Sequence, residues 1–234
     1  MAQPRPNERP LQGETAQTLD RGLRVLDILA SYPAGLSVPD IAQALNIHRT
    51  IAYRLLNTLV AHRLVRRTED NRYCLGIGLI ELARHVVPRL QEAAYPAMRQ
   101  LAEELRATAC LTIMDGDEGV VLTTLEPRTT TMHIAYRPGF RHMLDKGASG
   151  LAILAGRPRQ PGERREITMA RKRGYATSYD EIQYGASGIA APIQPDGQQA
   201  EASIGVVLLG KIDEATFAPH IIAAAHTIAS ALLT

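Results

Sequence analysis

Apolar residues between positions 37 and 61 recur at helical spacing in two short runs separated by a break. Ser37, followed three residues later by Asp40, is a capping-box pattern that begins the first helix. Asn46 tolerates the left-handed backbone of a tight turn, so we expect it to join this helix to a second one. The buried face of the second helix is predicted by apolar residues that recur every four positions, Ile51, Leu55 and Leu59, with Ala52 and Leu56 widening the stripe. The two runs together predict a helix-turn-helix.

The opposite face of the second helix is polar, and an arginine-rich hairpin pattern follows it. That face holds side chains able to reach phosphates or base edges: Arg49, Thr50, Tyr53 and Arg54. Residues 66–73 predict a strand, a polar turn and a returning strand, with Arg66 and Arg67 on one arm and Arg72 on the other. A solvated surface helix and hairpin could carry the same charges, but the order of elements favours a winged helix-turn-helix. We therefore expect the helix in the major groove of DNA and the hairpin arginines at flanking phosphates or in the minor groove.

The chain divides into four segments on these patterns. Residues 1–16 are rich in proline and poor in apolar residues, which predicts a disordered arm. The winged helix-turn-helix domain spans 17–76, and its first helix shows the apolar stripe Leu19, Leu23, Leu26 and Leu29. Residues 77–88 predict a linker helix, and 89–234 predict a second domain. The length of 234 residues fits two domains at about 100–200 residues each.

The second domain mixes strands and helices. Its expected strands are 110–114, 120–125, 130–136, 175–179, 189–193 and 202–209. Its expected helices are one over 90–105, a short one over 149–154 and a C-terminal one over 214–233. Turns of hairpin length between several of the strands predict an α+β domain around an antiparallel sheet.

Composition agrees with DNA binding without proving it. The formal net charge is only +2, but the chain up to Gly76 carries ten arginines against seven acidic residues. The remainder carries sixteen basic against seventeen acidic residues. Cys74 and Cys110 have no metal-ligand spacing. Because no apolar run reaches about 18 residues and the N-terminus is polar, we expect a soluble cytoplasmic protein without a membrane partner.

Enzymatic chemistry has little support in the sequence. Gly147-Ala-Ser-Gly150 recurs as Gly185-Ala-Ser-Gly188, yet the glycine directly follows each serine, whereas a nucleophile elbow requires G-x-S-x-G. The seven histidines form no metal-binding motif, although His133 and His142 could meet in space. We therefore expect no catalytic residues, no metal and no cofactor. Two alternatives stay open: a ligand-binding domain that turns over its ligand, and an architectural DNA-binding protein without a ligand.

Several motifs of this chain are those of a known family. They are TLDRGLRVLDILA (18–30), GLSVPDIAQALNIHRT (35–50), YRLLNTL (53–59), RYCLG (72–76), RKRGYATSYDE (171–181) and GIAAPI (188–193). In this order and across both domains, the chain resembles the IclR family of bacterial transcriptional regulators. The resemblance implies a GAF-like effector domain that binds a small organic molecule, and a homodimer, often a tetramer. A dimer would read a pseudo-palindromic operator in double-stranded DNA. Whether it acts as a repressor or an activator depends on where the operator lies.

The resemblance also implies an effector pocket. Its walls would be the 145–151 segment, strand 175–179, the turn into 188–190 and strand 204–209. The residues offered there are Asp145, Ala148, Ser149, Leu151, Ser178, Tyr179, Gly188, Ile189, Val207 and Leu209. Both faces of 204–209 are apolar, so alternation leaves open which one faces inward. Since a small dicarboxylate would lose its hydration without a cationic partner, we expect a mainly hydrophobic or aromatic effector. Its polar head would bond to Ser149 and the neighbouring amides.

Overall fold

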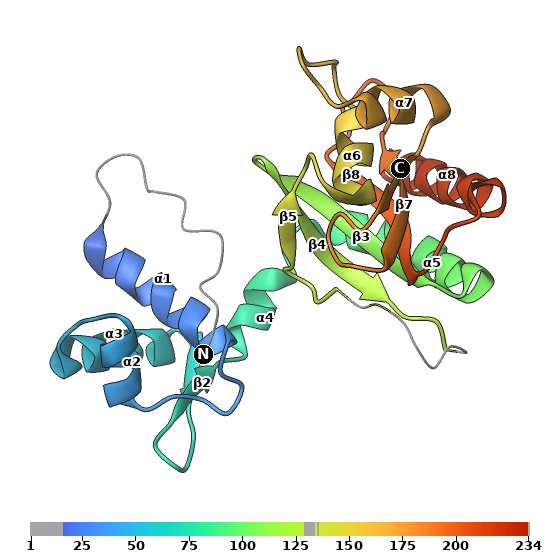
Figure 1. Ribbon diagram of the computed structural model, residues 1–234. Coiled ribbons are helices and arrows are strands. Elements are labelled where there is room, and N and C mark those ends of the chain that lie inside the picture. The colour runs from blue at the N-terminus through green and yellow to red at the C-terminus, as the bar shows by residue number, and fades with distance from the viewer. Residues whose placement is uncertain (1–15, 129–133, 135, 234) are drawn as a thin grey trace. The chain divides into compact units, whose positions relative to one another are not determined.

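The computed structural model describes residues 16–128, 134 and 136–233 (Figure 1). The chain forms two compact units, Met1–Val86 and Val87–Thr234, and each is described by itself. Of the expected disordered arm, residues 1–15 lie outside the described residues. Most of the strand expected at 130–136 also lies outside them.

The N-terminal unit is a bundle of helices with a two-stranded hairpin. Its elements are α1 (Gln17–Ala30), α2 (Val38–Ala44), α3 (Arg49–Ala61), β1 (Val65–Arg67), β2 (Tyr73–Leu75) and α4 (Gly78–Ala83). The Ser37 hydroxyl accepts a hydrogen bond from the Asp40 amide at 3.4 Å, and the Asp40 carboxylate accepts one from the Ser37 amide at 3.1 Å. Asn46 has a φ of 51° between α2 and α3. The predicted helix-turn-helix and its hairpin are confirmed.

Of two predicted apolar stripes, the one on α3 is confirmed except for Ile51, and the one on α1 is shifted. In α3, Ile51 is 38% exposed, and the buried side chains are Ala52, Leu55, Leu56 and Leu59. In α1, Leu19 and Leu23 are exposed, and the buried residues are Gly22, Val25 and Leu29. In α3, positions spaced by four residues rotate by about 40° per step around a helix of 3.6 residues per turn, so Ile51 at the start of the series leaves the core.

The apolar segment after the hairpin forms a shorter helix than the sequence predicted. Instead of spanning 77–88, α4 ends at Ala83, and Val87 has a φ of 44°. The residue before a proline is disfavoured in the right-handed helical region, while proline itself suits the first position of a helix. Pro88 therefore begins the next helix, α5, rather than only breaking the previous one.

The second unit is a six-stranded antiparallel sheet with helices on both faces. Its helices are α5 (Pro88–Leu105), α6 (Gly147–Ala155), α7 (Arg165–Arg173) and α8 (Glu214–Ala231). Its strands are β3 (Thr108–Asp115), β4 (Glu118–Leu125), β5 (Arg141–Met143), β6 (Ala176–Tyr179), β7 (Ala186–Ile193) and β8 (Ala202–Leu209). They lie in the order β5-β4-β3-β8-β7-β6. The predicted α+β class is confirmed, whereas β5 and α7 had no clear hydrophobic periodicity and were missed.

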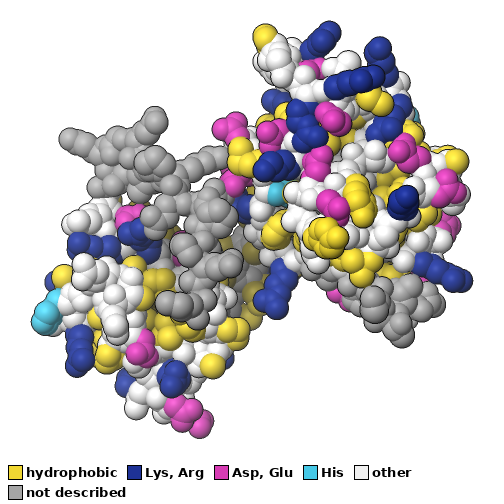
Figure 2. Space-filling model, in the orientation of Figure 1, with side chains coloured by type: hydrophobic (Ala, Val, Ile, Leu, Met, Phe, Trp, Pro, Cys, Tyr) yellow, Lys and Arg dark blue, Asp and Glu magenta, His cyan; other side chains and the backbone are white. Residues whose placement is uncertain are grey.

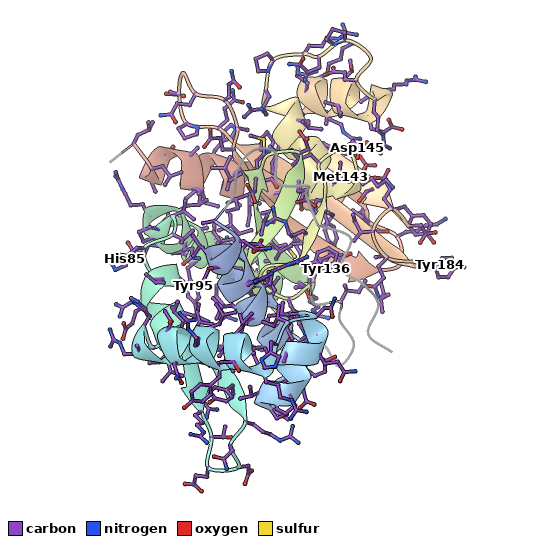
Figure 3. All side chains as sticks on the ribbon, turned by 90° about the vertical axis from the view of Figure 1, so that its left-hand side faces the viewer. His85, Tyr95, Tyr136, Met143, Asp145 and Tyr184 are labelled. Atoms are coloured by element: carbon purple, nitrogen blue, oxygen red, sulfur yellow. The ribbon has the colours of Figure 1, made fainter. Side chains whose placement is uncertain are left out.

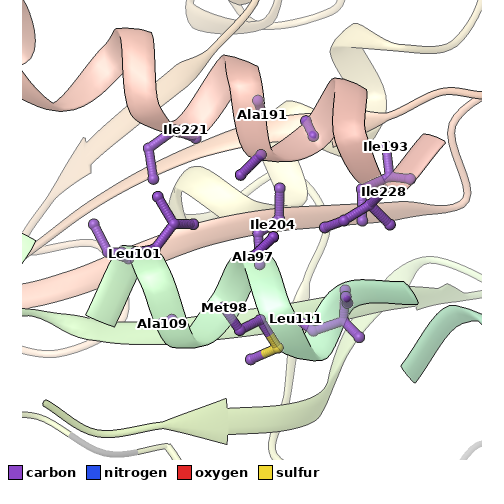
Figure 4. Close-up of a cluster of buried hydrophobic side chains, with 14 of the residues drawn as sticks. Ala97, Met98, Leu101, Ala109, Leu111, Ala191, Ile193, Ile204, Ile221 and Ile228 are labelled. Atoms are coloured by element: carbon purple, nitrogen blue, oxygen red, sulfur yellow. The ribbon is translucent and has the colours of Figure 1, made fainter. Parts of the chain in front are cut away.

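The main core of this unit lies between one face of the sheet and the helices α5 and α8. Figure 4 shows Met98 and Leu101 of α5 and Ile221 and Ile228 of α8 against Ile204 of β8. The other face is covered by α6 and α7, whose buried residues form a smaller cluster with β6 and β7. Alternating residues of the central strands therefore face two different sets of helices.

Candidate functional site

Helix α3 presents a polar face whose arginine side chains are not paired within the described part of the protein. Arg49, Thr50, Tyr53 and Arg54 are all exposed, opposite the buried side of the helix. The side chains of Arg49 and Arg54 make no hydrogen bond or ion pair with another described residue. Basic side chains lie over several parts of the surface of this unit, with acidic ones between them (Figure 2). The polar face of α3 can therefore contact phosphates or bases without first breaking a contact of its own.

The beginning of α3 is fixed by a residue that sequence reasoning did not single out. His48 is the N-cap, and its Nδ1 accepts a hydrogen bond from the Thr50 amide at 3.3 Å. The same ring nitrogen lies 3.1 Å from the Thr50 hydroxyl oxygen. Histidine is not among the preferred N-cap residues, so only its place before the helix could have indicated this role. His48 holds Thr50 at the first turn of the predicted recognition helix.

The hairpin places its three arginines in different environments. Arg66 is exposed and has no partner among the described residues. Arg67 donates a hydrogen bond to the Asn71 side-chain oxygen at 2.6 Å, across a turn in which Asn71 has a φ of 59°. Arg72 instead donates from Nη1 to the Gly35 carbonyl at 3.1 Å. The structure thus leaves Arg66 free and ties Arg72 to the loop between α1 and α2.

The second unit contains a small, partly open cavity between the sheet and the start of α6. Five of the ten predicted effector residues line it: Ala148, Ser149, Ser178, Gly188 and Val207. On β8, Ile204 and Val206 belong to the core with α5 and α8, while Val207 packs with Cys110 on the cavity side. The register of β8 therefore determines which face of residues 204–209 is turned toward the cavity, a question that the apolar sequence left open.

The other five predicted residues lie away from the cavity. Leu151 is fully buried against α7, and Ile189 is fully buried on the sheet face that packs on α5 and α8. Tyr179 and Leu209 are 57% and 44% exposed. Asp145 is also exposed and lies beside Met143 (Figure 3). A range of sequence includes both faces of a strand or helix, which is why it included residues that point elsewhere.

The first amides of α6 already have partners within the protein. The Gly147 amide donates to the Glu181 carboxylate at 2.7 Å, and the Ala148 amide donates to the Ser178 hydroxyl at 2.9 Å. Glu181 is in turn paired with Arg164 at 2.8 Å. The amides expected to hold an effector head group are thus engaged by side chains of β6 and its following turn.

The cavity lining also includes residues that the sequence analysis did not assign to the site, among them Cys110, Thr112, Tyr136 and His142. Burial raises the pKa of the Cys110 thiol and of the Tyr136 phenol, each to about 12, so both are neutral at physiological pH. Tyr136 also stacks on Phe140, with ring centroids 4.9 Å apart. Alternation along β3 could have indicated Cys110 and Thr112 together, because they share one face of the strand.

The two glycine-serine repeats considered for catalysis lie on different elements. Gly147-Ala-Ser-Gly150 begins α6, while Gly185-Ala-Ser-Gly188 enters β7, where the Ser187 hydroxyl donates to the Gly210 carbonyl. Of the histidine pair, His133 lies outside the described residues. Within the described ranges, no helix has the length and apolar character needed to cross a membrane.

The chain is similar to known proteins in both sequence and fold. Residues 18–69 match the IclR helix-turn-helix domain. The chain is 30% identical to the transcriptional regulator BhcR of Paracoccus denitrificans over 215 residues, covering 81% of this chain and 76% of that protein. It is 25% identical to XynR of Escherichia coli over 229 residues, covering 86% and 90%. The fold is similar to that of an IclR homolog from Microbacterium hydrocarbonoxydans solved with 4-hydroxybenzoate, with a TM-score of 0.80, 24% identity and coverage of 92% and 99%.

Proposed function

Because this chain belongs to the IclR family of transcriptional regulators, we propose that α3 reads an operator whose affinity changes when a small organic effector binds the second unit. The observation that carries the DNA-binding part is the polar face of α3. The side chains of Arg49 and Arg54 have no intramolecular partner among the described residues, while the opposite face is packed in the core. In a winged helix-turn-helix, such a face enters the major groove and the wing reaches the flanking backbone.

The proposed functional unit is a homodimer on a pseudo-palindromic operator. One recognition helix covers too few base pairs to select a genomic site, and two-fold protein symmetry matches two-fold operator symmetry. Exposed apolar side chains of the N-terminal unit offer a surface for a partner: Leu19, Leu23, Ile77, Ile80 and Leu82. Assembly of such dimers into a tetramer is proposed from the family resemblance alone.

Selection of bound duplexes from a random DNA pool by the full-length protein tests the DNA-binding part. We expect enrichment of one sequence with two related half-sites, and binding that weakens steeply as salt increases. Recovery of unenriched DNA with the same affinity would favour an architectural role and contradict sequence-specific regulation.

The effector proposed for the cavity is neutral and largely apolar. No lysine or arginine is among the described residues that line it, and its one carboxylate, Glu181, is held by Arg164 and the Gly147 amide. An anionic ligand would therefore lose hydration without gaining a free cation. The 4-hydroxybenzoate bound by the Microbacterium homolog indicates that a related fold can hold a single aromatic ring. For this chain we infer from the homolog only that an effector the size of one aromatic ring is suitable. We propose that the effector is an uncharged aromatic or hydrophobic compound.

Calorimetry against neutral aromatic compounds, lipophilic acids and short organic acids tests this assignment. We expect binding of neutral aromatics and a matching change in operator affinity. Tight binding of glyoxylate- or pyruvate-sized anions, with no response to aromatics, would refute it. Chemical analysis of the recovered ligand separates regulation from turnover, because a regulator returns its ligand unchanged.

A further inference from the structure

The hydroxyl of Thr112 is a buried polar group without a partner. Thr112 is 0% exposed on the face of β3 that lines the cavity. Its Oγ1 has no hydrogen-bond partner among the described residues. A buried hydroxyl without a partner destabilises a fold, so it is normally paired within the protein or with a bound group. Thr112 thus places an unpaired polar group among the residues that line the cavity.

Three polar groups near Thr112 are engaged elsewhere. Ser203 lies directly across from Thr112 in the pairing of β3 with β8, and its hydroxyl donates to the Ser149 carbonyl at 3.0 Å. The Gly147 and Ala148 amides donate to Glu181 and Ser178. An effector group that enters the cavity would therefore find Thr112 uncommitted, in contrast to the amides at the start of α6.

We propose that Thr112 is a specificity-determining residue whose hydroxyl hydrogen-bonds a neutral oxygen, a hydroxyl or carbonyl, on an aromatic effector. A threonine hydroxyl can donate and accept, so both groups fit it, whereas a carboxylate would also require a cation that the cavity lining lacks. This inference rests on the proposed effector function and adds the chemical group that the site recognises.

Thr108 provides a matched control on the same strand. It is also 0% exposed, and its Oγ1 also lacks a partner among the described residues. It does not line the cavity. Replacing either threonine by valine keeps the side-chain shape and removes an unpaired buried hydroxyl, so neither change should lower the stability of the ligand-free protein. Only Thr112→Val should change ligand selection.

The test compares polar and apolar probes of similar shape on the full-length protein by ligand-observed NMR. The probe pairs are phenol with toluene, and acetophenone with ethylbenzene. In the wild type and in Thr108→Val, we expect the polar member to bind about two- to tenfold more tightly than its apolar mate, beyond any difference in solubility. In Thr112→Val the preference should fall close to one, and Thr112→Ser should retain it.

Each of the other outcomes of this experiment contradicts a specific part of the proposal. A preference that persists in Thr112→Val, or that falls equally in Thr108→Val, removes Thr112 from recognition. Binding of both members without preference by the wild type also overturns the Thr112 assignment but leaves the effector cavity standing. Binding of neither pair by the wild type overturns the neutral aromatic effector itself, and the Thr112 inference with it.

Discussion

Replacing Arg49 or Arg54 by alanine should weaken operator binding without changing the fold. Both side chains are exposed on α3, and neither has a partner among the described residues, so truncation leaves no buried group unpaired. The loss is then that of one base or phosphate contact, about 1–3 kcal/mol, or about 5- to 150-fold in dissociation constant. The free energy of unfolding should stay within about 0.5 kcal/mol of the wild type.

Arg63 is the matched control for these two substitutions. It is an exposed arginine of the same unit, but it pairs with Glu81 at 3.0 Å. Its replacement by alanine should leave operator affinity nearly unchanged and should cost at most about 1 kcal/mol of stability, as expected for an exposed ion pair.

Fluorescence anisotropy on the selected operator and on a scrambled duplex, at several salt concentrations, measures these effects. Arg49→Ala and Arg54→Ala should reduce the preference for the operator. Arg66→Ala should weaken both duplexes alike and reduce the salt slope by about one, as for a phosphate contact. Wild-type affinity in both α3 variants, or a loss as large in Arg63→Ala, would refute the assignment of the recognition face.

Three further predictions concern other parts of the chain. Ile80→Glu places a charge on a side chain that is 58% exposed, so it should raise the dimer dissociation constant by at least about tenfold without unfolding the monomer, as sedimentation would show. Arg171 holds the pKa of Glu163 at about 2, so the ionised Glu163 carboxylate stabilises the fold at neutral pH. Glu163→Gln should therefore lower the melting temperature at neutral pH. The difference in melting temperature from the wild type should vanish as the pH falls from 4.5 through about 2. An unchanged difference at low pH would contradict this. Arg72→Ala should reduce the free energy of unfolding by about 1 kcal/mol through loss of the Gly35 hydrogen bond, and should weaken DNA binding less than Arg54→Ala.

Local signals were sufficient for the elements of the DNA-binding unit. The Ser37 and Asp40 capping box, the left-handed turn at Asn46 and the hairpin after α3 each depend on residues a few positions apart. The same holds for most strands of the second unit, which follow alternation and turn residues. The family motifs then supplied the order of the two units and the approximate walls of the cavity, although not which side chains face it.

Contacts between distant segments decided the rest. The pairing of β8 with β3 packs the Val207 side chain with Cys110 and the Val206 side chain in the core with α5 and α8, although both look alike in the sequence. Glu181 reaches the start of α6 across 34 positions of chain, and Arg72 reaches Gly35 across 37. Thr112 became a candidate only when packing buried its hydroxyl without a partner. Such features depend on how the elements pack against one another, and a pattern of hydrophobicity along the chain carries no record of that packing.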